Sequence, residues 1–270
     1  MAHIEITDVN DPRLDAYRNL KTRSENGESL FIAEGAYLVE RLARSRHTVL
    51  SYLTTDSNME SVREWANDDT PIYCLPPTQI RTLVGFDFHR GIMACGQRPA
   101  VADPSMALQQ LIESANRSAD QETTLLILPK THDPANLGGI LRIAAAFGVA
   151  ATILGPHCAD PLSRRVLRTS MGSSLDALTI ETANLLATIG QLREVQFHIA
   201  ATTLDESATP FTKVTRPTRM ALLMGPEGEG LNEELVRACD SNLTIPIRND
   251  VDSLNVTVAT GIFLQHFCGS

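Results

Sequence analysis

Three groups of polar residues in the C-terminal half of the chain have the types and spacing of a chemical site. The first holds Asn136 and Arg142, with Gly138 between them. Asp133 is expected to cap a helix here, and Pro134 suits its first turn. Arg142 stands in the apolar run ILRIAAAFG, where an isolated buried charge would be very costly. We therefore expect its guanidinium to meet an anion or, equally, a partner in a structural ion pair.

The second group is the glycine-rich loop GPEGEG, residues 225–230, which follows the apolar run Met220–Met224. Its spacing differs from GxGxxG, and the carboxylates of Glu227 and Glu229 would repel a pyrophosphate. The loop therefore disfavours a nucleotide-dependent oxidoreductase. A cationic or polyhydroxylated ligand suits it better.

The third group is Ser253-Leu254-Asn255, at the start of a helix predicted from about Leu254 to Phe267. Asp252 or Ser253 can cap that helix. The side chains of Ser253 and Asn255 can instead line a pocket with hydrogen-bond donors and acceptors. Both roles remain open on the spacing alone.

The elements that must position these groups alternate between apolar strands and helices. Strands are predicted at 125–129, 151–155, 195–203, Met220–Met224 and Leu243–Ile247, with a helix starting near Asn232. This alternation indicates a mostly parallel sheet with helices on both faces. Ligands of such sheets bind at the carboxyl ends of strands, so the last two strand ends are expected to form one pocket.

The N-terminal part reads as a separate small α/β domain. Strands are predicted at 49–55, 71–75 and 91–97, and helices at 59–66 and 78–84, while Gly35 marks a strand-to-helix junction. We predict a domain over 1–99, a linker over 100–122 that contains a helix opening at Asp103-Pro104, and a second domain over 123–270.

Composition limits the possible partners. The net charge of −9 argues against a broad nonspecific grip on nucleic acid, so RNA contacts must come from local patches. Two clusters are candidates, each equally interpretable as a solvated helix face: Arg41, Arg44, Arg46 and His47; and Arg164, Arg165 and Arg168.

Nothing in the sequence indicates a membrane protein, a secreted protein or a metal centre. The apolar runs are far shorter than the roughly 18 residues of a membrane helix, and the N-terminus has no signal-peptide core. The five cysteines show no metal-ligand spacing and favour reduced thiols. We therefore expect a cytoplasmic protein without a metal site.

Taken together and in this order, the three groups resemble a known family. DPANLGGILRIAAAFG, LLMGPEGEGL and IPIRNDVDSLNVTVATGI are similar to the signature motifs of the SpoU (TrmH-type) RNA ribose 2′-O-methyltransferases of the SPOUT class. The resemblance covers about residues 122–268 and includes LSRRVLRTSMGSS. More loosely, FIAEGAYLVERL resembles the start of the family's N-terminal substrate-binding domain.

This resemblance implies a C-terminal SPOUT-type parallel sheet with a deep trefoil knot, preceded by a small α/β substrate-binding domain. It implies an enzyme that works as a homodimer and transfers a methyl group from S-adenosyl-L-methionine to a ribose 2′-hydroxyl. The implied cofactor-binding residues are Gly225, Ile245 and Leu254. The implied catalytic residues are Asn136, Arg142, Glu227, Ser253 and Asn255. The implied RNA-binding residues are Arg164, Arg165 and Arg168.

The substrate class follows from the same resemblance. Ribosomal RNA is favoured by the N-terminal domain, with transfer RNA, or a noncatalytic RNA-binding protein of the same fold, as the alternatives. The sequence leaves open which nucleotide is methylated. It also leaves open whether the N-terminal basic cluster contacts RNA, and whether Arg142 acts as a base or only stabilises charge.

Overall fold

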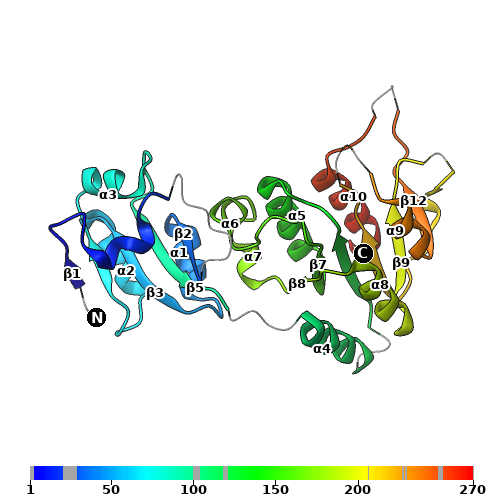
Figure 1. Ribbon diagram of the computed structural model, residues 1–270, viewed down its shortest axis with the longest axis horizontal. Coiled ribbons are helices and arrows are strands. Elements are labelled where there is room, and N and C mark those ends of the chain that lie inside the picture. Colours follow the sequence, from blue (N-terminus) through cyan, green and yellow to red (C-terminus); the bar gives the residue numbers. More distant parts are fainter. Residues whose placement is uncertain are drawn as a thin grey trace. The chain divides into compact units, whose positions relative to one another are not determined.

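The computed structural model describes residues 3–20, 29–99, 104–117, 121–205, 207–226, 228, 230–248 and 252–269. Contacts between Cα atoms divide the chain into two compact units. The N-terminal unit comprises Met1–Ala100 and Leu162–Asp176, and the C-terminal unit comprises Val101–Pro161 and Ala177–Ser270. Each unit is built around its own sheet (Figure 1).

The N-terminal unit holds a five-stranded mixed sheet. In spatial order its strands are β1 (His3–Glu5), β4 (Ile72–Cys74), β3 (Val49–Thr54), β5 (Ile92–Gln97) and β2 (Leu30–Glu34). β5 runs antiparallel to both of its neighbours, whereas β1, β4 and β3 are parallel. Its helices are α1 (Ala36–Ala43), α2 (Met59–Trp65), α3 (Pro77–Val84), α6 (Arg164–Thr169) and α7 (Ser173–Asp176).

Side chains of this sheet alternate between two apolar cores, as a strand period of two requires. Phe31 and Tyr52 enter one core together with residues of α1 and α2. Ile32 and Leu53, their neighbours in sequence, enter the other core with residues of α3 and of the 3-10 helix Pro12–Tyr17. Both faces of the sheet are therefore buried.

The segment Leu162–Asp176 belongs to the N-terminal unit although it follows more than sixty residues of the C-terminal one. Leu162, Leu167 and Leu175 are buried in the core that also holds Phe31. The predicted division at residues 99 and 123 placed this segment in the second domain. A short helix with a few apolar residues carries no local signal for which of two cores will bury it.

The C-terminal unit contains a seven-stranded sheet in which every paired neighbour is parallel. Its strand order is β10 (Thr209–Pro210), β12 (Ser241–Thr244), β9 (His198–Thr202), β11 (Arg219–Leu223), β6 (Thr123–Leu128), β7 (Ala151–Leu154) and β8 (Thr179–Glu181). The predicted mostly parallel α/β architecture is thus confirmed.

Helices cover both faces of this sheet. α4 (Pro104–Arg117), α8 (Leu185–Glu194) and α9 (Glu233–Ala238) share one apolar core with the strands. α5 (Pro134–Ala146) and α10 (Val256–Cys268) pack against each other (Figure 1). Three strands of two or three residues, β1, β8 and β10, were not predicted, because so short a run has no readable periodicity.

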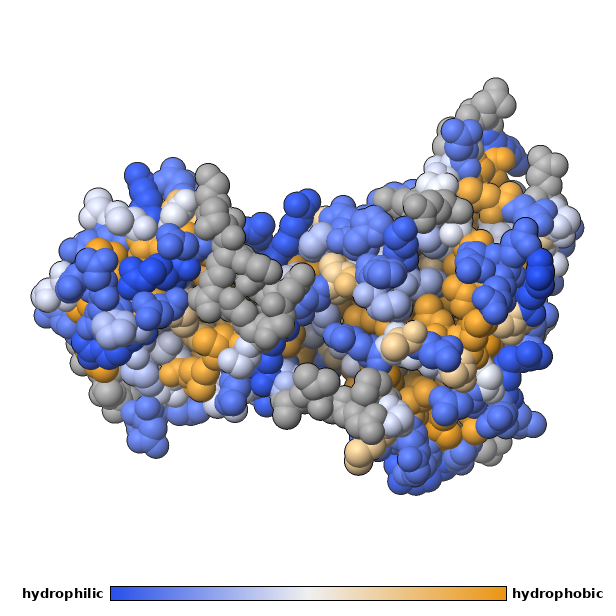
Figure 2. All heavy atoms as spheres, viewed as in Figure 1, coloured by the Kyte–Doolittle hydropathy of each residue, from blue (hydrophilic) through white to orange (hydrophobic). Residues whose placement is uncertain are grey.

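The described surface is mixed in polarity. Hydrophilic residues cover most of the face drawn in Figure 2, with apolar residues showing between them. Among the described residues, no helix combines the length and apolar character required to cross a bilayer. All five cysteines are free thiols, of which Cys74 and Cys95 are buried.

Candidate functional site

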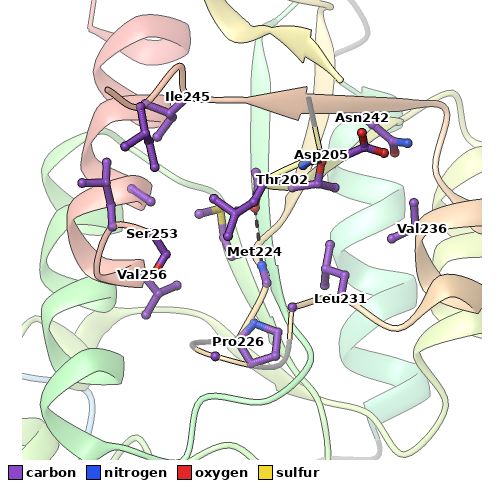
Figure 3. A pocket seen from close by; sticks show the side chains of 18 of the residues that line it. Thr202, Asp205, Met224, Pro226, Leu231, Val236, Asn242, Ile245, Ser253 and Val256 are labelled. Atoms are coloured by element: carbon purple, nitrogen blue, oxygen red, sulfur yellow. Dashed lines mark hydrogen bonds between the residues drawn. The ribbon is translucent and has the colours of Figure 1, made fainter. Parts of the chain in front are cut away.

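A cavity of about 700 Å³ lies at the carboxyl ends of β9, β11 and β12. The residues after β9, the glycine-rich loop after β11, helix α9, the residues after β12 and the start of α10 all contribute to its wall (Figure 3). The predicted cofactor residues Gly225, Ile245 and Leu254 all line it, as does Ser253. The two-strand pocket expected from the sequence is therefore a three-strand pocket.

A hydrogen-bond pair ties the first two strand ends together. The Thr202 hydroxyl donates to the carbonyl of Leu223 at 3.1 Å and accepts from the Gly225 amide at 3.4 Å. A Cβ on Gly225 would lie 3.4 Å from Leu231 Cγ, an ordinary contact. Gly225 is thus held at the cavity wall, and a much larger side chain there would have to extend into the cavity.

The cavity combines apolar walls with carboxylates. Met224, Leu254, Val256 and Phe263 are among its apolar lining. Asp205 also lines it, and the amide of Ser207 donates to Asp205 Oδ1 at 2.8 Å. Hydrogen bonds from Ser207 lower the pKa of this carboxyl below its usual value, so Asp205 carries a negative charge near neutral pH.

Asn136 and Asn255 lie 119 residues apart in the sequence and are hydrogen-bonded to each other beside the cavity. The Asn255 side-chain Nδ2 donates to Asn136 Oδ1 at 3.0 Å. Asn136 lies in the first turn of α5, which Asp133 caps by accepting from the Ala135 amide at 2.9 Å. The expected cap at Asp133 is confirmed, and the fold brings these two site residues together.

Helices α5 and α10 approach closely at this pair because Gly139 has no side chain. A Cβ there would lie only 2.6 Å from Thr257 Cγ2, closer than real Cβ atoms come to other heavy atoms. The Thr257 hydroxyl donates to the Asn136 carbonyl at 3.3 Å. Gly139 and Thr257 together therefore set the spacing at which the two asparagines meet.

Of the two roles left open for the residues before α10, capping the helix falls to neither Asp252 nor Ser253. Asn255, and neither Asp252 nor Ser253, is the N-cap, with its Oδ1 accepting from the Thr257 amide at 2.9 Å. Ser253 is exposed and lines the cavity. The predicted strand Leu243–Ile247 ends earlier, at Thr244, which leaves Ile245 and Ile247 free to line the cavity.

Arg142 is exposed on α5, so the expectation that it is a buried charge is corrected. The run around it is apolar, but a helix presents successive residues at 100° intervals and Arg142 falls on the solvent side. Among the described residues its side chain makes no hydrogen bond or ion pair, and it does not line the cavity. Glu227 lies outside the described residues.

The three arginines predicted to bind RNA differ in their contacts. The Arg164 side chain is 13% exposed, donates to Glu34 at 3.1 Å and to the Leu20 carbonyl at 2.7 Å, and lies over the Phe86 ring. Arg165 is exposed. The Arg168 side chain is 42% exposed, and its Nη1 lies 3.7 Å from Glu34.

The N-terminal basic cluster is largely paired within its own unit. Arg41 bonds to Asp176 at 2.9 Å and Arg44 to Glu40 at 2.7 Å. His47 Nε2 lies 3.0 Å from the Leu175 carbonyl, and burial lowers the pKa of this histidine. Two arginines of this cluster, Arg41 and Arg44, are therefore engaged in ion pairs within the unit.

The cavity residues at the end of β9 and directly after it were not predicted from the sequence. Thr202, Thr203, Leu204 and Asp205 line the cavity although no motif marks them. The available signal was the strand predicted at 195–203, since strand ends of a parallel sheet meet at one edge. The sequence does not show that this strand lies between β11 and β12 in the sheet. Among the described residues no group of His, Cys, Asp and Glu is arranged to hold a metal ion.

Comparison with known proteins places this geometry in a family. The profile of the SpoU rRNA Methylase family matches residues 123–265. A Mycobacterium tuberculosis protein described as an uncharacterized tRNA/rRNA methyltransferase is 33% identical over 96% of this chain and 89% of its own length. The 23S rRNA (guanosine(2553)-2′-O)-methyltransferase of Bacillus subtilis is 25% identical over 98% and 99% of the two chains.

A solved structure agrees over nearly the whole chain. The AdoMet-bound rRNA methyltransferase from Sinorhizobium meliloti superimposes with a TM-score of 0.80 at 26% identity, covering 98% of this chain and 97% of that one. Fold and cavity thus define an α/β methyltransferase. This chain belongs to the SpoU rRNA methylase family.

Proposed function

We propose that this protein is an S-adenosyl-L-methionine-dependent methyltransferase that methylates a ribose 2′-hydroxyl in structured RNA, with ribosomal RNA as the favoured substrate. One observation carries the proposal. The cavity at the strand ends is lined by Gly225, Ile245 and Leu254, and the Asn136–Asn255 pair stands beside it. The relatives named for 2′-O-methylation of 23S rRNA support the reaction and the substrate.

The cavity fits the proposed cofactor. Its volume of about 700 Å³ lies within the usual range of ligand pockets, roughly 300–1,000 Å³. Ile245 and Leu254 offer an apolar wall for the adenine, and the ionised Asp205 complements a cationic donor. When bound, S-adenosyl-L-methionine supplies a methyl group on a positively charged sulfonium.

The catalytic residues are assigned to orientation and charge stabilisation. A guanidinium group is a poor general base, but that of Arg142 can stabilise the developing 2′-oxyanion or bind the adjacent phosphate. Asn136, Asn255, Ser253 and Glu227 orient the ribose and the donor, because a small misplacement of reacting atoms costs much rate.

Three of these residues, Asn136, Arg142 and Asn255, do not line the described wall of the cavity. We propose that the protein is a homodimer in which a second copy of the chain completes the site. α10 supports this proposal with exposed apolar residues: Val258 is 51% exposed, and a shallow hollow that also has polar lining lies along Phe211, Val258 and Ile262. Such a face suits burial against an identical helix pair.

The trefoil knot is part of the same proposal. β11 lies between β9 and β6, and the chain then crosses to β12 on the far side of β9 before α10 returns to pack on α5. A crossing of this kind permits threading of the C-terminal residues. We also propose that the protein works in the cytoplasm, where its RNA would be found.

We propose that the N-terminal unit binds the RNA substrate. We also propose that the contiguous residues 1–99 form the RNA-binding domain, 100–122 the linker and 123–270 the methyltransferase domain. Of the three arginines expected to contact RNA, Arg165 and Arg168 have the exposure to do so. Arg164 forms an ion pair with Glu34 and a cation–π contact with Phe86, so we assign it the structural role of holding this surface in place.

The test is methyl transfer in vitro with purified protein. RNA from a strain that lacks the gene is incubated with tritiated S-adenosyl-L-methionine, and the labelled nucleosides are identified after digestion. Label in a 2′-O-methylnucleoside of ribosomal RNA supports the proposal, and label confined to transfer RNA supports the alternative substrate. Cofactor binding without transfer to either RNA would favour a noncatalytic RNA-binding protein.

A further inference from the structure

A second, smaller cavity lies in the N-terminal unit. Its volume is about 270 Å³, and it is lined by residues 34–38, Arg90, Arg168 and Met171. That volume falls just below the roughly 300 Å³ at which pockets for whole small molecules begin. It therefore suits one group of a polymer better than a free cofactor.

Arginine dominates the charge of this cavity. Glu34 is buried, with a relative exposure of 6%, and its Oε2 lies 3.1 Å from Arg164, which is itself nearly buried. That pair satisfies the carboxylate. Arg168 lies 3.7 Å from the same oxygen, beyond normal hydrogen-bond length, so most of its donors are available.

Arg90 is the second cation of the wall, and it is exposed. Within the described part of the chain it makes no ion pair. Its side chain lies across Gly35, where a Cβ would sit 2.9 Å from Arg90 Cδ, and Gly35 has φ of +93°, which favours glycine. Glycine at position 35 thus lets Arg90 reach over the cavity.

An aromatic ring stands at the edge of the same cavity. Tyr37 is 54% exposed, which is unusual for a large hydrophobic side chain in this unit, and it lines the cavity together with both arginines. Two guanidinium groups beside an exposed ring match the way proteins hold single-stranded nucleic acid. Arginine binds the phosphate with several donors, and the ring stacks on a base.

We propose that this cavity holds one backbone phosphate of the RNA substrate between Arg90 and Arg168, while Tyr37 stacks on an adjacent unpaired base. The inference rests on the proposed function for the identity of the RNA, but phosphate binding can be measured without methyl transfer. A single strand fits better than a duplex, because the bases of a duplex are not free to stack on a protein ring.

The test measures binding of a fluorescein-labelled oligouridylate of about 12 nucleotides by fluorescence anisotropy with the full-length protein. Arg90→Ala and Arg168→Ala are each expected to weaken binding about tenfold. The double variant should lower the slope of log affinity against log salt by about 0.7, the value for one phosphate of a single strand. Arg63→Ala, which removes an exposed arginine of α2 in the same unit, is the matched control and should leave both quantities unchanged.

Tyr37 gives a readout that separates stacking from charge. Tyr37→Leu should weaken binding about fivefold or more without changing the salt slope, whereas Tyr37→Phe should bind as the wild type does. S-adenosyl-L-methionine binding and the far-ultraviolet circular dichroism spectrum of every variant should match the wild type.

Three results would overturn the inference: no measurable binding of the oligouridylate by the wild type, unchanged affinity in Arg90→Ala, or an equal loss in Arg63→Ala. Because Arg90 is exposed, its variant remains informative even if Arg168→Ala unfolds the segment 162–176. A wild type that binds the oligouridylate but fails to methylate any RNA would refute the proposed function and leave the phosphate site standing.

Discussion

Two hydrogen bonds that join Asn255 to other described residues at the start of α10 can be removed one at a time by substitution. Its Oδ1 accepts from the Thr257 amide at 2.9 Å and caps the helix. Its Nδ2 donates to Asn136 Oδ1 at 3.0 Å. Asn255→Ala removes both interactions. Asn255→Ser retains a hydroxyl that can cap the helix but cannot reproduce the amide bond to Asn136.

The expected loss of stability follows from these contacts. Loss of an N-cap side chain costs about 1 kcal/mol. The bond to Asn136 adds about 0.5 kcal/mol, at the low end of the usual range because Asn255 is exposed. Asn255→Ala should therefore destabilise the C-terminal unit by about 1.5 kcal/mol and Asn255→Ser by about 0.5 kcal/mol. Hydrogen exchange of α10 amides is the assay, because the sole tryptophan, Trp65, lies in the other unit.

The expected loss of activity follows a different order. Both variants remove the Asn255 hydrogen bond that orients the Asn136 side chain, so both should lower methyl transfer by about 10- to 100-fold. Asn184→Ala is the matched control, because Asn184 caps α8 by accepting from the Ala187 amide at 3.0 Å and does not line the cavity. It should lose comparable helix stability and keep its activity. Full activity in Asn255→Ser, or an equal loss in Asn184→Ala, would refute the reasoning.

Three further predictions concern charge, space and pH. Arg142→Ala should abolish methyl transfer and leave cofactor affinity nearly intact in calorimetry, and undiminished transfer would contradict its role. Gly225→Ala should bind the cofactor normally, because its Cβ meets only ordinary contacts. Gly225→Phe should bind the cofactor at least tenfold more weakly, because its ring must enter the cavity. Equal cofactor affinities in the two variants would contradict the placement of the cofactor. Burial lowers the pKa of His47 below 6.5, so protonation favours the unfolded state and stability should fall as pH drops below 6.5. The free energy of unfolding can be measured in urea by Trp65 fluorescence at about pH 7.5 and about pH 5.5. It should fall between the two pH values in the wild type and fall less in His47→Gln. An equal fall in both proteins would exclude His47 as the cause.

The parts of the fold that were predictable carry a local signal. The apolar run before GPEGEG became β11, and the helix predicted from Asn232 begins there, with Asn232 as its N-cap. Asp133 caps α5 as its position before Pro134 indicated. Each of these features depends on residues within a few positions of one another.

The parts that were missed depend on contacts distant in sequence. The Asn136–Asn255 bond joins residues 119 apart and requires α5 and α10 to pack at Gly139. Arg142 looked buried because its neighbours are apolar, yet its helix position faces solvent. The pocket residues after β9 could not be assigned without the strand order, which no local pattern encodes.

The measurement that tests the central claim most directly is a transcriptome-wide map of ribose 2′-O-methylation in isogenic cells with and without the gene. We predict that at least one 2′-O-methyl site, in ribosomal RNA, is present with the wild-type gene, absent without it and absent when the gene carries Arg142→Ala. Identical maps in all three strains would contradict the account.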